Sequence, residues 1–306
     1  DWNYGHELGR KYIQERFSDE IETEAIENVS PDENAATVLE DLIDFGSDII
    51  FTTTSQLIQP SLKAAVEHPE VKILNCSLNT THQYIRTYYA RMYEGKFLTG
   101  VIAGSLTENN RIGYVADYPI YGITANINAF ALGAKLVNPR AKVYLEWSTL
   151  KDHDIYKTFW EQQVSYVSNQ DMITPQNASR QFGLYHINND EITNLVMPVW
   201  NWGVFYEKLL QSIMNGSWKK EDDTDGTKAL NYWWGMSAGV IDIICSQNLP
   251  ASTRHLVDVL KHMICKGELD PFGGEIRAQD GTVMSKENEK MQPEEIVTMD
   301  WLVDNV

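Results

Sequence analysis

The sequence GMSAG at residues 235–239 matches GxSxG, the nucleophile elbow in which a serine attacks an acyl carbon. His255 and His262 follow it and could serve as general bases. The elbow requires a helix directly after the serine, whereas the β-branched run VIDIIC after Gly239 predicts a strand. We therefore interpret Ser237 as part of a small-residue turn that leads into a strand, not as a nucleophile.

Other motifs that could carry chemistry are incomplete. HELGR at residues 6–10 lacks the second histidine of a zinc-protease helix, because Arg10 stands in its place. STLK at residues 148–151 matches SxxK without a following KTG. EDDTDG at residues 221–226 begins like a calcium loop, but position twelve is Tyr232. The seven histidines are scattered and no glycine-rich phosphate loop occurs, so the sequence predicts neither a metal site nor a cofactor.

Aromatic and amide side chains are frequent where predicted strands end. In parallel α/β sheets these positions converge on the ligand, and rings there can stack on a flat heterocycle while Asn, Asp and Thr read its edge. By period two, the two tryptophans of VWNWG share one strand face and the asparagine points away. The predicted ligand contacts are Trp2, Asn3, Tyr4, Thr53, Thr54, Tyr118, Asp171, His186, Trp200, Asn201 and Trp202.

The elements that would position these residues alternate between strand and helix, which predicts an α/β fold with parallel sheets covered on both faces. Two such series meet near residues 107–110 and indicate two similar lobes. A polar loop at 217–230 and a hairpin around Asp280 and Gly281 follow. The predicted strands are 23–29, 47–54, 71–77, 111–117, 141–147, 164–171 and 184–187, and the predicted helices are 34–46, 59–69, 88–106, 122–139, 156–163 and 174–183.

Composition narrows the partners. With 25 basic and 43 acidic residues among 306, the net charge of −18 disfavours nucleic acid and anionic membrane surfaces. The sequence contains no run of about 18 apolar residues, which is the length needed to span a bilayer. The three cysteines form no disulfide framework; Cys245 and Cys265 are the two that could pair, and the sequence leaves this open.

Eight segments in one order resemble the basic membrane protein family, the substrate-binding lipoproteins of ABC transporters with a type I periplasmic-binding-protein fold. The resemblance implies two Rossmann-like lobes joined by three crossover segments that close on a purine nucleobase or nucleoside. It implies binding without catalysis, a membrane permease as partner, a monomer, and an extracytoplasmic location, either lipid-anchored or periplasmic. The segments are IENV, DIIFTTT, YYARMYEGKFLTGVIAG, RIGYVADYPI, NINAFALGAKLVNP, VWNWG, GELDPFGG and MDWLVDNV.

From the resemblance we expect an N-terminal lobe of residues 1–107 plus 201–245 and a C-terminal lobe of residues 108–200 plus 246–306. The family's first strand would precede Asp1. Without that strand the first sheet would keep an unpaired ladder, so we expect residues upstream. PIYGI replaces the family's commoner PIPEV after Pro119, which is a departure from the family's pattern.

The resemblance also implies residue roles. Trp2 matches the family's base-stacking aromatic, Asp171 matches an acidic residue at a second-lobe strand end, and VWNWG matches a crossover beside the cleft. We hypothesise that Trp2 and an aromatic from residues 200–202 sandwich a purine while Asp171 accepts from its edge, which favours adenine or adenosine. The alternatives are a ligand-sensing domain of a receptor or regulator, a purine-processing hydrolase or phosphorylase, and a sugar as ligand.

Overall fold

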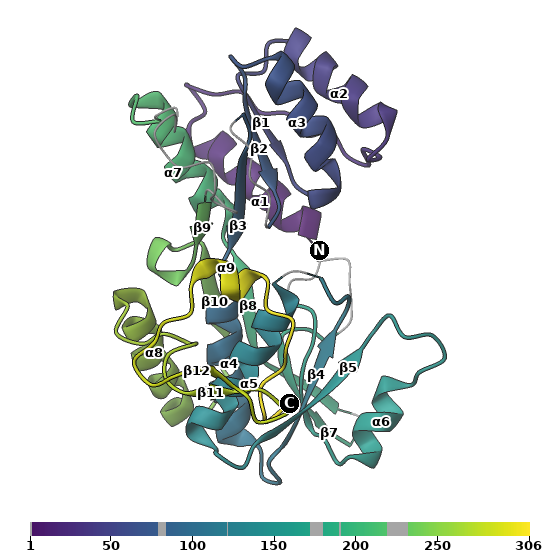
Figure 1. Ribbon diagram of the computed structural model, residues 1–306, viewed down its shortest axis with the longest axis vertical. Helices are drawn as coiled ribbons and strands as arrows, with labels where there is room; N and C mark the ends of the chain where they lie inside the picture. The colour runs from purple at the N-terminus through teal and green to yellow at the C-terminus, as the bar shows by residue number, and fades with distance from the viewer. Residues whose placement is uncertain (1, 79–83, 121, 172–179, 190, 219–231) are drawn as a thin grey trace. The chain divides into compact units, whose positions relative to one another are not determined.

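The computed structural model describes residues 2–78, 84–120, 122–171, 180–189, 191–218 and 232–306, and it divides them into two compact units (Figure 1). Unit 1 contains residues 91–200 and 235–306; unit 2 contains residues 2–90 and 201–234. The chain passes from one unit to the other after residues 90, 200 and 234. The α/β fold with parallel sheets is confirmed in both units.

Unit 2 contains a parallel sheet whose strand order is β1-β2-β3-β9. Ile50 and Ile73 of this sheet pack against Leu39 and Ala64 of two covering helices, which buries one continuous apolar cluster. The strands are β1 (Ile49–Thr52), β2 (Lys72–Cys76), β3 (Arg86–Ala90) and β9 (Tyr232–Trp234), and the helices are α1 (Trp2–Arg16), α2 (Glu33–Asp44), η1 (Ser55–Leu57), α3 (Ile58–Glu67) and α7 (Trp202–Met214).

Unit 1 contains a mixed sheet with strand order β10-β8-β7-β6-β4-β5. β5, β4 and β6 are parallel, while β7 is antiparallel to both of its neighbours. Its strands are β4 (Arg111–Ala116), β5 (Lys142–Trp147), β6 (Tyr166–Ser168), β7 (Leu184–Asn188), β8 (Glu191–Trp200) and β10 (Ile241–Cys245). Its other elements are α4 (Met92–Leu106), α5 (Ile123–Val137), α6 (Ile155–Glu161), η2 (Met236–Ala238), α8 (Ala251–Lys266), β11 (Ile276–Arg277), β12 (Val283–Ser285) and α9 (Pro293–Val297).

Helices α4 and α5 of unit 1 touch backbone to backbone at glycines (Figure 1). A Cβ atom on Gly100 would lie 1.9 Å from the Phe130 carbonyl oxygen, and one on Gly133 would lie 2.0 Å from that of Phe97. Glycine at these two positions is therefore what allows the two helices to approach so closely. In unit 2, α1 and α7 meet in the same way, because a Cβ on Gly9 would lie 2.9 Å from Trp202 Cβ.

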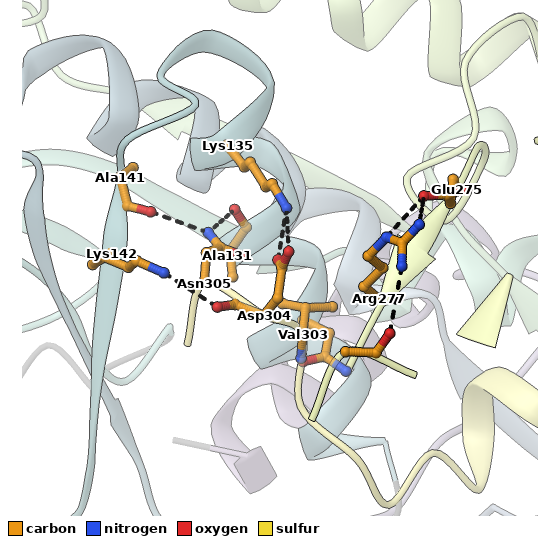
Figure 2. Close-up of polar contacts among 11 residues, drawn as sticks. Ala131, Lys135, Ala141, Lys142, Glu275, Arg277, Val303, Asp304 and Asn305 are labelled. Atoms are coloured by element: carbon orange, nitrogen blue, oxygen red, sulfur yellow. Dashed lines mark hydrogen bonds and ion pairs between the residues drawn. The ribbon is translucent and has the colours of Figure 1, made fainter. Parts of the chain in front are cut away.

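The last residues of the chain are fastened to α5 and β5 (Figure 2). Lys135 Nζ lies 2.6 and 2.8 Å from the two carboxylate oxygens of Asp304, and Lys142 Nζ donates to the Asp304 carbonyl at 3.2 Å. The side-chain amide of Asn305, itself buried, donates to the Ala131 carbonyl at 2.9 Å. Hydrogen bonds of the main chain and of the side chains thus hold the C-terminal residues 303–306 against unit 1.

Three expectations about local structure are wrong. Residues 23–29 form no strand; this segment pairs with no strand among the described residues, and β1 has β2 as its one ladder partner there. Residues 88–90 end β3 instead of beginning a helix. β8 ends at Trp200 and α7 begins at Trp202, so these two tryptophans do not share a strand face.

Of the other expectations, some are confirmed, some differ from the structure and some fall outside the described residues. β11 and β12 form the predicted hairpin, and the three cysteines are free. Most of the predicted helix at 174–183 and of the polar loop at 217–230, with its EDDTDG segment, lies outside the described residues; residues 180–183 form no helix. Residues 91–107 and 235–245, expected in the N-terminal lobe, belong to unit 1, where α4 packs on α5. In the part of the chain that the structure describes, no helix is both long enough and apolar enough to cross a membrane.

Candidate ligand-binding site

In unit 2, Trp2 lies at the carboxyl edge of the parallel sheet. Its indole Nε1 donates to the Thr53 carbonyl at 2.6 Å, directly after β1. Its ring stacks on Tyr89 near the end of β3, with centroids 5.8 Å apart and planes at 22°. Trp2 and Tyr89 are both half-buried. This edge is where parallel α/β sheets place ligands, and the position gives a pair of rings for a planar molecule.

The loop after β1 is held from beneath by Asn75. This fully buried side chain of β2 donates to Thr52 Oγ1 at 2.7 Å and to the Thr54 carbonyl at 2.9 Å. Thr54 is the N-cap of η1, and its hydroxyl accepts from the Gln56 amide. Thr53 and Thr54 are half-buried at a fixed edge, as a ligand-reading loop requires.

Trp202 belongs to the core of unit 2. Its side chain is 1% exposed, and its ring stacks on His6 at 4.4 Å and meets Trp2 edge to face at 5.6 Å. His6 Nδ1 lies 2.6 Å from the Tyr206 hydroxyl, and burial lowers the pKa of His6 to about 3, so the imidazole is neutral at pH 7. Trp202 therefore supports Trp2 from below and offers no wall of its own to a ligand.

In unit 1, Asp171 follows β6 and pairs with Lys96 of α4. Both side chains are largely buried, at 10% and 3% exposure. Lys96 Nζ also lies 3.3 Å from Ser168 Oγ and 3.5 Å from the Asn169 carbonyl oxygen, and 5.2 Å from the centre of the Tyr114 ring. The Lys96 ammonium group thus contacts three polar residues at the carboxyl end of β6.

Burial raises the pKa of Asp171, Lys96 opposes that rise, and Asp117 adds to it. Asp117 follows β4 and is fixed by the loop after β5: Ser148 Oγ donates to its carboxylate, and Thr149 Oγ1 donates to its carbonyl at 2.7 Å. Two carboxylates therefore lie beyond the carboxyl ends of neighbouring parallel strands, where a ligand's N–H groups would find acceptors.

The structure brings some other predicted contacts to this edge of unit 1. Tyr118 follows β4 and is 60% exposed. Trp200 is half-buried at the end of β8, which runs parallel to β6 through the intervening antiparallel β7. Because Val196 and Ser168 both pair with Leu184, Trp200 lies on the Asp171 side of the sheet.

His186 is not brought to this edge. It pairs with Tyr166 at the first position of β6 and stacks on that ring at 4.4 Å, toward the end opposite Asp171. In unit 2, Asn3 is exposed and Tyr4 half-buried on α1, and Asn201 is half-buried at the N-cap of α7.

The elements around GMSAG decide whether this motif can form a nucleophile elbow. Ser237 lies in η2, between β9 and β10, so a strand follows the turn as predicted and the nucleophile elbow is absent. Among the described residues, no group of three or more His, Cys, Asp or Glu side chains could hold a metal ion.

Lys96, Tyr89 and Asn75 contact the predicted site residues or their loop in the structure, and none of the three was predicted from the sequence. Lys96 carried a usable signal: a lysine inside the apolar run around KFLTGVIAG must be buried, and a buried cation requires a partner. Tyr89 was hidden by the assignment of its segment to a helix, and Asn75 gave no signal beyond a polar residue within an apolar strand.

Comparison with known proteins agrees with this architecture. Residues 1–184 match the Bmp family, described as ABC transporter substrate-binding protein PnrA-like. A purine-binding protein of Brucella abortus (strain 2308) is 29% identical over an alignment of 318 positions that covers 100% of this chain and 88% of that protein. A candidate ABC transporter glucose-binding protein, TsgA13 of Haloferax volcanii, is 28% identical, with 89% of this chain and 71% of that protein covered.

Among solved structures, an ABC transporter solute-binding protein from Conexibacter woesei superposes with a TM-score of 0.62 at 16% identity, covering 88% of this chain and 93% of that one. This likeness supports the type I periplasmic-binding fold. Proteins of this class deliver a ligand to a membrane permease outside the cytoplasm. With more than half of its length matched, the chain belongs to the Bmp family of ABC transporter substrate-binding proteins.

Proposed function

We propose that this chain binds a purine nucleobase or nucleoside, with adenine or adenosine favoured, for uptake through an ABC permease. The observation that carries the proposal is the purine-binding relative that aligns with the whole chain. The chemistry of each unit, taken by itself, is consistent with it: the carboxyl edge of unit 2 carries an aromatic platform, and that of unit 1 carries a carboxylate acceptor.

Trp2, supported by Tyr89, would stack on one face of the base, whereas Trp202 is buried and would not contact it. Stacking contributes about 1–3 kcal/mol per base–aromatic contact. A hydrogen bond from an exocyclic amine to the Asp171 carboxylate would add about 1.5–3 kcal/mol. These terms suffice for a neutral ligand on a chain whose net charge is −18.

The glucose-binding name of the second relative makes a sugar the alternative ligand. Isothermal titration calorimetry of the purified protein with adenine, adenosine, guanosine, hypoxanthine and D-glucose separates the two. Saturable binding of an aminopurine, without a response to glucose, is the expected result. A glucose isotherm with no purine isotherm would reject the proposal.

The alternative that the protein is a purine-processing enzyme is tested with the same samples. The proposed role is binding without catalysis, so adenosine incubated with the protein is expected to remain intact by chromatography. Stoichiometric binding followed by release of free adenine would move the assignment to a hydrolase.

A further inference from the structure

Lys96 is a cation enclosed by the interior of unit 1. It lies in the first half of α4, whose residues from Met92 through Gly104 are all buried, and its side chain is 3% exposed. An ammonium group in such a place is costly unless every N–H finds an acceptor and a counter-charge is near. The position of Lys96 therefore depends on the groups that surround Nζ.

Those groups form a complete set. The Asp171 carboxylate, the Ser168 hydroxyl at 3.3 Å and the Asn169 carbonyl at 3.5 Å give three acceptors for three N–H donors, and the Tyr114 ring lies 5.2 Å away. Lys96 thus has no donor left over for a ligand. The Asp171 carboxylate has two oxygens, and the contact to Nζ uses Oδ1.

We propose that Lys96 is a positioning residue for ligand selection: it keeps the Asp171 carboxylate ionised and fixed, so that Asp171 accepts hydrogen bonds from an amino edge and discriminates against a carbonyl edge. This inference rests on the proposed function, because it names the group of the ligand that the same site reads. An ionised carboxylate is an acceptor only, whereas a protonated one also donates.

The charged and titratable groups facing Asp171 in the described residues are Lys96 from α4, Tyr114 from β4 and Asp117 after β4. Burial and Asp117 raise the pKa of Asp171, and Lys96 is the one group among these that lowers it. Removing the ammonium would therefore raise this pKa further. As pH falls, the carboxyl group would then take up a proton at a higher pH than it does in wild type, and could donate to the 6-oxo group of hypoxanthine.

The test compares adenine with hypoxanthine by calorimetry from pH 6 to pH 8.5, in wild type, K96M, K96R, D171N and K96M/D171N. K96M is expected to lose about tenfold or more in adenine affinity at pH 6 and to recover part of it at pH 8.5, while hypoxanthine affinity holds or rises. Wild type and K96R, which keep a positive charge, are expected to vary less over this range. D171N is expected to lose adenine affinity at every pH.

The double variant K96M/D171N measures whether the effects of Lys96 and Asp171 on adenine affinity depend on each other. Once Asp171 is neutral, removing Lys96 should cost little further adenine affinity, so K96M/D171N should resemble D171N. Equal losses that simply add would mean that Lys96 acts through the fold and not through Asp171. K96M with the adenine affinity and pH profile of wild type would overturn the proposal outright.

A ligand-free measurement separates this inference from the proposed function. The carboxyl ¹³C resonance of Asp171 can be titrated in wild type and in whichever of K96M and K96R folds, with circular dichroism as the check on folding. A midpoint higher in K96M than in wild type or K96R supports the role of Lys96 even if no purine binds. If purine binding fails and the midpoint is also unchanged, both proposals fall; an unchanged midpoint with purine binding intact rejects the role of Lys96 alone.

Discussion

The imidazole of His6 lies flat against the indole of Trp202, with centroids 4.4 Å apart and planes at 17°. Both side chains are buried in unit 2, and Trp202 in turn meets Trp2 edge to face. The stack joins α1 to α7, so the ring that we propose as ligand platform is supported by a group that must remain neutral.

This stack predicts an acid-sensitive stability. The pKa of His6 is about 3 in the folded protein against about 6.5 when unfolded, so between these values the unfolded chain binds the extra proton. Stability contributed by neutral His6 is therefore complete above pH 6.5 and falls by about 1.4 kcal/mol per unit as pH drops toward 3. Urea unfolding at several pH values measures it.

The control is His6→Phe, which keeps a ring against Trp202 and cannot titrate. The variant loses the Tyr206 hydrogen bond and starts less stable, but its stability should fall less steeply with acid than that of wild type. Parallel curves for the two proteins from pH 6.5 to pH 4 would contradict the assignment.

Glu94 is expected to change the pH dependence of stability in the direction opposite to that of His6. This buried carboxyl of α4 accepts from the Met236 amide at 2.6 Å, and burial raises its pKa above the usual value despite that bond and Arg91. The folded state then holds a proton that the unfolded chain has released, so stability falls as pH rises from about 4.5 through the folded pKa.

Glu94→Gln keeps an acceptor for the Met236 amide without the charge, and should remove this part of the pH dependence. Glu94→Ala leaves that amide unpaired and should cost about 1–3 kcal/mol at all pH values, measured by urea unfolding. Similar pH profiles for wild type and Glu94→Gln would mean that Glu94 does not titrate in this range.

Strand and helix alternation was predictable because apolar spacing, together with segment length, separates a short buried strand such as 47–54 from an amphipathic helix such as 34–46. The failures have tertiary causes. Residues 23–29 have strand-like composition, but a strand exists only with a ladder partner. YYARM and VWNW each cross a boundary between element types, and periodicity over four or five residues does not locate it.

The site was predictable at the level of its edge and not of its contacts. Thr53 and Asp171 were expected at this edge because strand ends are recognisable in sequence, and Trp2 was expected there from the resemblance to the family; their role in binding stays a prediction. Their partners were not predicted, because Lys96 and Asp171 stand 75 positions apart and Trp2 meets Tyr89 through the fold of a whole sheet. Trp202 shows a different error. It was predicted to contact the ligand, but its side chain is buried and packs against Trp2.

The contact between α4 and α5 predicts that a single methyl group destabilises unit 1. Gly100→Ala would place Cβ 1.9 Å from the Phe130 carbonyl oxygen, which forces the helices apart. Overpacking of this kind costs about 1–3 kcal/mol and outweighs the gain of about 1 kcal/mol in helix propensity. Thermal or urea unfolding gives the value.

Gly95→Ala is the matched control in the same helix. Its Cβ would lie 3.2 Å from Pro198 Cβ and 3.4 Å from Ile241, a tight contact between side chains that can adjust. We expect its stability to remain within about 1 kcal/mol of wild type. Equal effects of the two substitutions would show that the close approach at Gly100 is not what limits the packing.

Ligand binding is predicted to depend on Trp2. Trp2→Ala removes the ring that stacks on Tyr89 and bonds to Thr53, and about 1–3 kcal/mol of base stacking with it, so purine affinity by calorimetry should fall tenfold or more. The matched control is Trp160→Ala on α6, where the side chain is 80% exposed and belongs to unit 1, whereas Trp2 belongs to unit 2. Trp160→Ala should bind as wild type does. Unchanged affinity in Trp2→Ala, with folding intact, would remove the aromatic platform from the binding model and leave Asp171 to be tested alone.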